Sequence, residues 1–400
     1  MLAVTAESPT LQPPANALAA VVHPDPYPFY ASLAARRPLD YDASLGLWVA
    51  AGPQVMAAVL RHADCGVRPI GARVPAALAD GAAGDWFGAL VRMNDGPVHA
   101  AMKPWLNARL ATLRADAATL GRLREASQAA CADAYLACGD ALAARLDDYV
   151  FRQPIYALAA WLGVAPAQWA EVYDDAHKLV AAMAESAKPA PRINVLAHGH
   201  QAASSLRHRV DQWLDDAHAP GSWLRDTARA AARDEAVDYG ALAANVMGLF
   251  TQAHDACAGL VANSLRRLAR CTTQTSETAG LPVAANAVRE VVRFDPPVQN
   301  TRRFLHANVV IGERTLSRGD AILVVLAAAP TQDLPDDVAW TFGQGAHACP
   351  GRSPATTLAT VGVQAILDSG VDLPALADGS GYHPLGNVRI ARFSPDGATR

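Results

Sequence analysis

The stretch from Tyr239 to Arg270 contains no proline and has the composition of one long helix. At a rise of about 1.5 Å per residue, such a helix would run about 48 Å. Alanine and leucine dominate other stretches that have apolar residues at helical spacing: Pro154 to Leu162, Trp169 to Met183 and Val195 to Ala217. Strand-like segments are few and short: Leu47 to Val49, Val309 to Ile311 and Ile322 to Val325. This balance predicts a mainly α protein with minor β.

Composition limits the possible partners and locations of this chain. Its 400 residues are 51% hydrophobic and carry a net charge of −4, which allows a large core and gives no reason to expect nucleic acid as a partner. No repeat or long linker divides it, so we expect a flexible N-terminal segment, residues 1–25, and one domain, residues 26–400. The start lacks the features of a signal peptide, and no apolar run of about 20 residues could span a membrane. The sequence therefore predicts a cytoplasmic protein without a membrane anchor.

One of six scattered cysteines lies in a loop punctuated by glycines, residues 342–351, ahead of a run with helical composition. The lone Cys349 cannot make a structural zinc site, which needs four ligands. It can supply the single axial thiolate of a haem iron. The glycines let the backbone pass close to a flat cofactor and leave amides free to face the sulfur. The alternative is a glycine-rich turn before a helix, with an incidental cysteine.

This loop resembles the cysteine-ligand loop of the cytochrome P-450 family, whose pattern is Phe-Gly-x-Gly-x-His-x-Cys-x-Gly. All six fixed positions match: Phe342, Gly343, Gly345, His347, Cys349 and Gly351. The resemblance extends from about residue 26 to about residue 394. It implies the cytochrome P-450 fold, with haem b (iron protoporphyrin IX) buried between the central long helix and this loop. It also implies that Cys349 is the metal ligand and that Phe342, Gly343, His347 and Gly351 help to bind the cofactor.

Three basic residues resemble the family's anchors for the two haem propionates. His99 and Lys103 share a helical face after a helix-start signature at residues 95–97, and two such donors suit two anionic groups. The family has arginine where this chain has Lys103, so the charge remains but the bidentate fork is lost. Arg303 resembles the family's strand arginine, and Arg302 is the competing register. Each residue taken alone is equally well a surface cation.

Glu290 and Arg293 share a helical face at a spacing of three residues. They resemble the family's Glu-x-x-Arg pair, which implies a structural role in the core beneath the haem. Two further positions depart from the family. Residues 330–333 replace the usual Asn-Arg-Asp, and Pro350 removes an amide donor near the sulfur.

The central helix also departs from the family, in which it carries Ala-Gly-x-Asp/Glu-Thr-Thr/Ser over the iron. Here the aligned residues place Asp255 at the acid position and Ala256 at the position of the key threonine. A methyl group can neither hydrogen-bond to dioxygen nor pass protons to it. The candidate catalytic residues are therefore Gln252, His254, Asp255 and Ala256.

Several groups could replace the missing hydroxyl: Asp255 through water, Cys257, Thr251, or a polar group of the substrate itself. We favour the polar group of the substrate as the replacement for this hydroxyl. Asp255 and water would be the next groups in the proton pathway, and Gln252 would orient the substrate group. Gln252 is equally well a residue that caps a neighbouring carbonyl. Ala256 could simply make room for a bulky substrate.

Three functions remain open at this stage. The first is a monooxygenase-type oxidoreductase acting on a small organic molecule in specialised (secondary) metabolism, with electrons from ferredoxin and ferredoxin reductase. The second is a haem-thiolate enzyme that uses peroxide or rearranges its substrate, which the missing threonine favours. The third is a haem-binding protein without turnover. The family's layout implies pocket residues near 66–90, 182–194, 247–257, 298–301 and 381–387, and it does not name the substrate.

Overall fold

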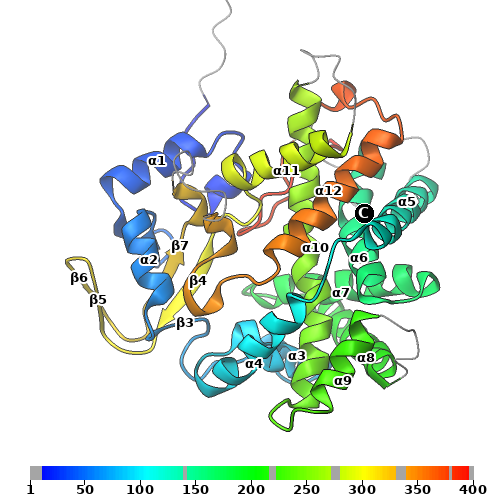
Figure 1. Ribbon diagram of the computed structural model, residues 1–400. Helices are drawn as coiled ribbons and strands as arrows, with labels where there is room; N and C mark the ends of the chain where they lie inside the picture. Colours follow the sequence, from blue (N-terminus) through cyan, green and yellow to red (C-terminus); the bar gives the residue numbers. More distant parts are fainter. Residues whose placement is uncertain are drawn as a thin grey trace, which may run out of the picture.

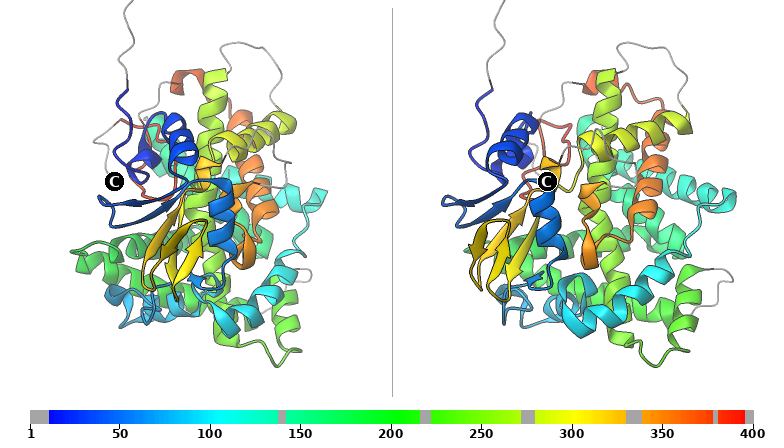
Figure 2. Two further views of the ribbon diagram at one scale, coloured as in Figure 1. Left: turned by 90° about the vertical axis from the view of Figure 1, so that its left-hand side faces the viewer. Right: turned by 60° about the vertical axis from the view of Figure 1, so that its left-hand side comes forward.

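The computed structural model describes residues 11–137, 142–215, 222–271, 280–329, 339–377 and 381–395. A larger helical part and a smaller part built around a sheet lie side by side, and helix α10 runs through the helical part (Figure 1). Two further views show the same parts: turned by 60°, the yellow strands lie to the left of most helices, and turned by 90°, they lie in front of them (Figure 2). The predicted mainly α fold with minor β is confirmed.

The α-helices include each stretch that the sequence predicted to be helical. They are α1 (Tyr27–Arg36), α2 (Pro53–Arg61), α3 (Ala82–Ala89), α4 (Gly96–Leu110), α5 (Ala117–Ala137), α6 (Leu142–Leu162), α7 (Trp169–Ser186), α8 (Ile193–Asp215), α9 (Trp223–Ala231), α10 (Tyr239–Cys271), α11 (Leu281–Phe294) and α12 (Arg352–Asp368). The predicted long helix is α10, and the other three stretches lie in α6, α7 and α8. Residues 216 and 217 of the last stretch are outside the described residues.

The main sheet has the strand order β1-β2-β7-β4-β3. Its strands are β1 (Leu39–Asp42), β2 (Leu47–Ala50), β3 (Cys65–Gly66), β4 (Thr301–Leu305) and β7 (Ala321–Val324). Strands β2 and β7 pair in parallel, and the other pairs are antiparallel. A separate hairpin joins β5 (Val309–Ile311) to β6 (Arg314–Leu316). The three predicted strands are found as β2, β5 and β7.

Helix α10 is packed on nearly every side. It contacts α3, α6, α7, α8, α11 and α12. Small and apolar residues surround its axis, which is typical of a helix inside a large core. One stripe near its middle stays accessible: Gln252 is exposed, and Ala253, Asp255 and Ala256 are half-buried. The fold therefore leaves open the face that carries three of the four candidate catalytic residues.

The chain is packed into the core well before residue 26, where the predicted domain begins. Ala17, Ala20 and Val21 are buried. The buried Arg389 donates hydrogen bonds to the carbonyls of Val21 and His23, at 2.8 and 2.7 Å. The end of the segment that we predicted to be flexible is thus held by the C-terminal part of the chain, while residues 1–10 lie outside the described residues.

Glu290 connects α11 to α10. Its Oε2 accepts a hydrogen bond from Arg267 of α10 at 2.9 Å. The guanidinium of Arg293 lies over the ring of Phe294, 5.4 Å from its centre. Residues 330–333, where the sequence departs from the family pattern, lie outside the described residues. Across the described ranges, no helix is long and apolar enough to cross a membrane.

Candidate functional site

The Cys349 loop has a conformation that requires its glycines. Gly343 and Gly345 have φ of +66° and +72°, in the left-handed region that favours glycine. A Cβ atom at Gly345 would lie 2.6 Å from the carbonyl oxygen of Leu60 in α2. The Cys349 N–H donates to the Phe342 carbonyl at 2.8 Å and closes the loop. Two of the matched positions are therefore explained by backbone geometry.

The Cys349 sulfur is surrounded by groups that act in opposite directions on its ionisation. The residue is exposed overall, yet the protein packed around its thiol is the largest influence and raises the pKa of Cys349. The Gly351 N–H donates to the sulfur and lowers this pKa, as do the charges of Lys103 and Arg92. A thiolate is the form that binds metal, and these three groups stabilise it. Pro350 has no N–H to donate to the sulfur, and the amide of Gly351 makes this hydrogen bond.

His347 and His99 lie together beside one carboxylate. Their ring centres are 4.2 Å apart. His347 Nε2 lies 2.9 Å from Asp95 Oδ1, and the Val67 N–H donates to Asp95 Oδ2 at 2.8 Å. Burial acts to raise the pKa of Asp95, but the hydrogen bonds from His347 and Val67 outweigh it and lower that pKa. Asp95 was not among the sequence candidates, although it precedes His99 by one helical turn.

The two other predicted anchors each donate to a backbone carbonyl. Lys103 Nζ donates to the carbonyl of Ala348 at 3.0 Å, so it holds the residue just before Cys349. Arg303 is buried, and its Nη1 donates to the carbonyl of Arg302 at 2.8 Å. Arg302 is exposed on the opposite face of β4. The strand's alternation thus points Arg303 inward and Arg302 outward.

The residues present fit a haem with two carboxylates. The buried nitrogens that have no hydrogen-bond partner within the described residues include three near this site: Arg92 Nε, His99 Nε2 and His347 Nδ1. Buried polar groups are normally paired, so an unpaired guanidinium nitrogen and two imidazole nitrogens, which donate when protonated, suit an anionic ligand. Arg92 influences the Cys349 thiol electrostatically, and burial lowers the pKa of Arg92 to about 10. Sequence patterns do not identify Arg92, because it lies in a short turn, Val91–Met93, without a diagnostic motif.

The accessible stripe of α10 offers an amide and a carboxylate but no hydroxyl. Gln252 Nε2 donates to the Gly248 carbonyl of its own helix at 2.7 Å, which is the capping contact that the sequence offers as an alternative role. Thr251 is buried, and its hydroxyl bonds to the same carbonyl at 3.2 Å. Cys257 is also buried, and burial raises the pKa of its thiol to about 12. Neither Thr251 nor Cys257 faces the stripe.

His254 points away from the stripe, into the packed layer between α10 and its neighbours. Its Nδ1 lies 2.7 Å from Asp255 Oδ1, and its Nε2 lies 3.0 Å from Nδ1 of His177 in α7. The rings of Phe151 and Tyr173 lie 5.1 and 6.2 Å away, centre to centre. The sequence did not identify His177, because a pair 77 residues apart leaves no local pattern.

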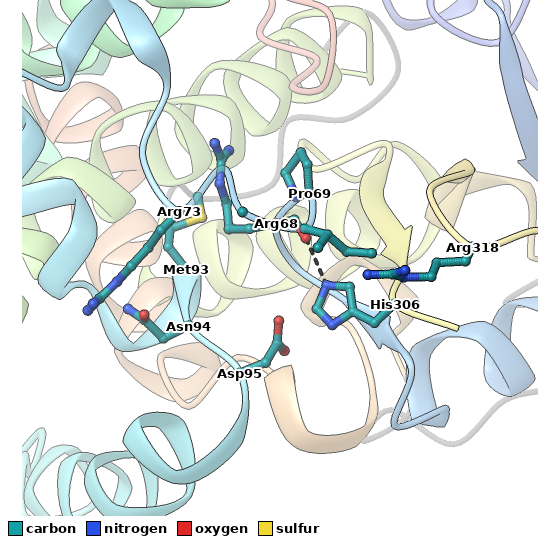
Figure 3. Close-up of a pocket in the computed structure, with 10 residues that line it drawn as sticks. Arg68, Pro69, Arg73, Met93, Asn94, Asp95, His306 and Arg318 are labelled. Atoms are coloured by element: carbon teal, nitrogen blue, oxygen red, sulfur yellow. Dashed lines mark hydrogen bonds between the residues drawn. The ribbon is translucent and has the colours of Figure 1, made fainter. Parts of the chain in front are cut away.

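A cavity of about 430 Å³ opens beside the Asp95 carboxylate. Its walls come from the start of the predicted 66–90 pocket segment, from the residues before α4, and from His306 and Arg318 near the sheet (Figure 3). His306 Nε2 bonds to the carbonyl of Arg68 at 2.9 Å. Through Asp95, this cavity adjoins the histidine pair next to the Cys349 loop.

Comparison with known proteins supports one fold. No protein-family model matches the chain, and no curated protein matches it. Among solved structures, cytochrome P-450 RauA, complexed with a biosynthetic intermediate of aurachin RE, is 20% identical, with a TM-score of 0.70 over 93% of this chain and 98% of that one. Epothilone B-bound cytochrome P-450 epoK is also 20% identical, with a TM-score of 0.69 and coverage of 93% and 97%. P-450 BioI, in complex with an acyl carrier protein that carries hexadec-9Z-enoic acid, is 19% identical, with a TM-score of 0.69 and coverage of 92% and 96%.

These similarities extend over almost the whole chain. The chain has the cytochrome P-450 fold.

Proposed function

We propose that this protein is a haem-thiolate oxidoreductase of the monooxygenase type that oxidises a small organic molecule. The observation that carries this proposal is the Cys349 loop. Its sulfur accepts the Gly351 N–H, lies near the charges of Lys103 and Arg92, and belongs to a loop that the left-handed glycines fix. Bound haem would supply oxygen activation, because a thiolate ligand pushes electron density toward iron and favours O–O cleavage.

The chain's own residues would bind and orient the cofactor. Cys349 would ligate the iron, and the Gly351 amide and Lys103 would hold the sulfur and its loop in place. His99, His347, Arg92 and Arg303 would bind the two carboxylates, because their nitrogens are buried and positively charged or able to become so. The stripe at Gln252, Asp255 and Ala256 would face the substrate.

Solved relatives suggest the class of substrate and partner. RauA was solved with a biosynthetic intermediate and epoK with epothilone B, so we propose a small molecule of specialised metabolism. BioI was solved with an acyl carrier protein, which makes a carrier-bound substrate one form to test. We propose ferredoxin and ferredoxin reductase as the electron donors and the cytoplasm as the location.

The test is turnover by the purified, haem-loaded protein. Candidate ligands are first screened for a shift in the haem absorption spectrum, and those that bind are then incubated with ferredoxin, its reductase, NADPH and dioxygen. The proposal predicts an oxidised product that requires all of these components and that Cys349→Ser abolishes. Haem-loaded protein that binds ligands but yields no product with dioxygen or with peroxide would contradict it.

A second candidate function is a peroxide-driven or non-oxygenating reaction. The observation in its favour is that Ala256 lacks the hydroxyl, while Thr251 and Cys257 are turned into the core. Product formation with hydrogen peroxide alone, and none with ferredoxin, reductase and dioxygen, would favour this second function.

A further inference from the structure

Two imidazoles and a carboxylate form a hydrogen-bonded chain between α7 and α10. His177 Nδ1 lies 3.0 Å from His254 Nε2, and His254 Nδ1 lies 2.7 Å from Asp255 Oδ1. An ionised carboxylate only accepts hydrogen bonds, so His254 Nδ1 carries a proton. In neutral His254 the other nitrogen, Nε2, is then an acceptor, and His177 Nδ1 is its donor. Both donors therefore point toward Asp255.

Burial along this chain is greatest in the middle. The side chain of His254 is 3% exposed, whereas that of Asp255 is 27% exposed. His177 is half-buried on α7. Asp255 lies three residues after Gln252 and next to Ala256, so its carboxylate belongs to the accessible stripe of α10. The three groups thus connect the α7 side of the molecule with the stripe, through a packed layer.

Aromatic rings enclose the central imidazole. Phe151 of α6 and Tyr173 of α7 flank His254, and the Tyr173 ring is nearly parallel to it, at 17°. The nearest charges on α6 are already paired, because Arg152 bonds to Asp148 at 2.5 Å while lying over the Tyr173 ring. The ring of His383 lies 5.2 Å from that of Phe151, centre to centre. Asp174 and Lys178 flank His177 along α7, and both are exposed.

We propose that His177 and His254 are a proton relay that supplies Asp255, and this proposal rests on the function proposed above. In one transfer, the His177 Nδ1 proton moves to His254 Nε2, and the His254 Nδ1 proton moves to Asp255. His177 takes up a replacement proton from water. The net result is one proton moved from solvent to the Asp255 carboxyl, with no electrons transferred. Return of both imidazoles to their starting tautomers completes the cycle.

The relay answers the chemical problem posed by Ala256. Reducing dioxygen consumes protons, and no hydroxyl on the accessible stripe can deliver them. When His254 passes a proton to the Asp255 carboxylate, the resulting carboxyl group holds a proton next to Ala256, and no hydroxyl is needed. Asp255 alone can then deliver this proton to the bound substrate, either directly or through a water molecule.

The first test reads the tautomers and needs no substrate. The full chain is labelled with ¹⁵N at histidine, and long-range ¹H–¹⁵N NMR spectra are recorded for the imidazoles of wild type, Asp255→Asn and His177→Gln. We expect His254 to carry its proton on Nδ1, and we expect its signals to shift when either neighbour is changed. His208→Gln, at an exposed position of α8, is the matched control and should leave them unmoved. A wild-type His254 protonated only on Nε2 would overturn the relay.

The second test uses dioxygen itself as the probe. Haem-loaded protein is supplied with ferredoxin, reductase and NADPH, and NADPH oxidation is compared in H₂O and D₂O. General acid catalysis contributes about 10²–10⁴-fold, so we expect His177→Gln to slow dioxygen-dependent oxidation at least about tenfold and to raise the solvent isotope effect. We expect a smaller loss in consumption of added hydrogen peroxide, which brings its own protons, whereas a structural defect would slow both reactions equally.

The outcomes separate the relay from the proposed function. If wild type consumes dioxygen and His177→Gln consumes it at the same rate and with the same isotope effect, the relay is overturned and the proposed function still stands. Wild type that consumes neither dioxygen nor peroxide contradicts the function, and the NMR spectra then decide on the hydrogen-bonded chain alone.

Discussion

At the scale of single residues, positive charge is concentrated around Cys349 and is opposed by one carboxylate. Lys103 and Arg92 act on the sulfur, and His347 is bonded to Asp95. The sequence predicts Lys103 as a propionate anchor, and in the structure its Nζ donates to the Ala348 carbonyl of the cysteine loop. Helical spacing indicates the face on which Lys103 lies, whereas its contact with Ala348 depends on where the loop folds back.

The two neighbouring arginines of β4 give a matched pair for the anchoring role. Arg303 is 5% exposed and points inward, whereas Arg302 is exposed. A charge-assisted hydrogen bond to a carboxylate contributes about 1.5–3 kcal/mol, so we expect Arg303→Ala to weaken haem binding at least about tenfold. Arg302→Ala should bind haem like wild type. The measurement is haem transfer to a competing haem-binding protein. Equal retention by both variants would remove Arg303 from the anchors.

At the scale of secondary-structure elements, the connection from α7 to α8 is fastened by one carboxylate. Pro189 and Pro191 lie in this connection, where α7 ends at Ser186 and α8 begins at Ile193. Glu185 Oε2 accepts hydrogen bonds from Lys188 and Arg192 at 2.8 and 2.9 Å. The break could be predicted from the prolines, whereas the three-residue network that closes it could not.

This carboxylate makes the connection sensitive to acid. Hydrogen bonds from Arg192, and then Lys188, lower the pKa of Glu185 from 4.5 to about 2. Because the folded pKa is the lower one, the stabilisation is complete above pH 4.5 and is lost as pH falls through about 2. We expect amides of residues 186–192 to exchange hydrogen faster in Glu185→Gln at pH 6, and the wild type to approach the variant toward pH 2. Glu125→Gln, at an exposed position of α5, is the control, and equal exchange in both variants would contradict the assignment.

Local pattern and long-range packing explain which elements of the site could be predicted. The Cys349 loop follows from its glycines, and the length of α10 follows from the absence of proline. The inward register of Arg303 follows from strand alternation, once β4 is known to pair with β7. The contact of His254 with His177 depends on how α7 packs on α10, which no local pattern encodes.

At the scale of the whole molecule, one buried arginine joins the two ends of the described chain. Arg389 Nε bonds to Asp295 at 2.8 Å, and its other nitrogens donate to the carbonyls of Val21, His23 and Pro24. The Arg389 side chain is 1% exposed. The N-terminal segment, the end of α11 and the C-terminal part therefore meet at this side chain.

Removing this arginine should destabilise the fold as a unit. Loss of one partner from a buried ion pair costs about 3–5 kcal/mol, so we expect Arg389→Met to lower the free energy of unfolding by about that amount in urea titrations. Arg314→Met, at an exposed position of β6, should change it by less than about 0.5 kcal/mol. A loss below about 1 kcal/mol in Arg389→Met would show that the connection is not structural.

Ligation of haem iron by Cys349 is the claim on which the proposed function rests, and one spectrum tests it most directly. Haem-loaded protein is reduced under carbon monoxide, and its absorption is compared between wild type, Cys349→Ser and Cys257→Ser, the last of which changes a buried thiol of α10. The account predicts the absorption band typical of thiolate ligation in wild type and in Cys257→Ser, and its loss in Cys349→Ser. The same band in Cys349→Ser as in wild type would contradict the account.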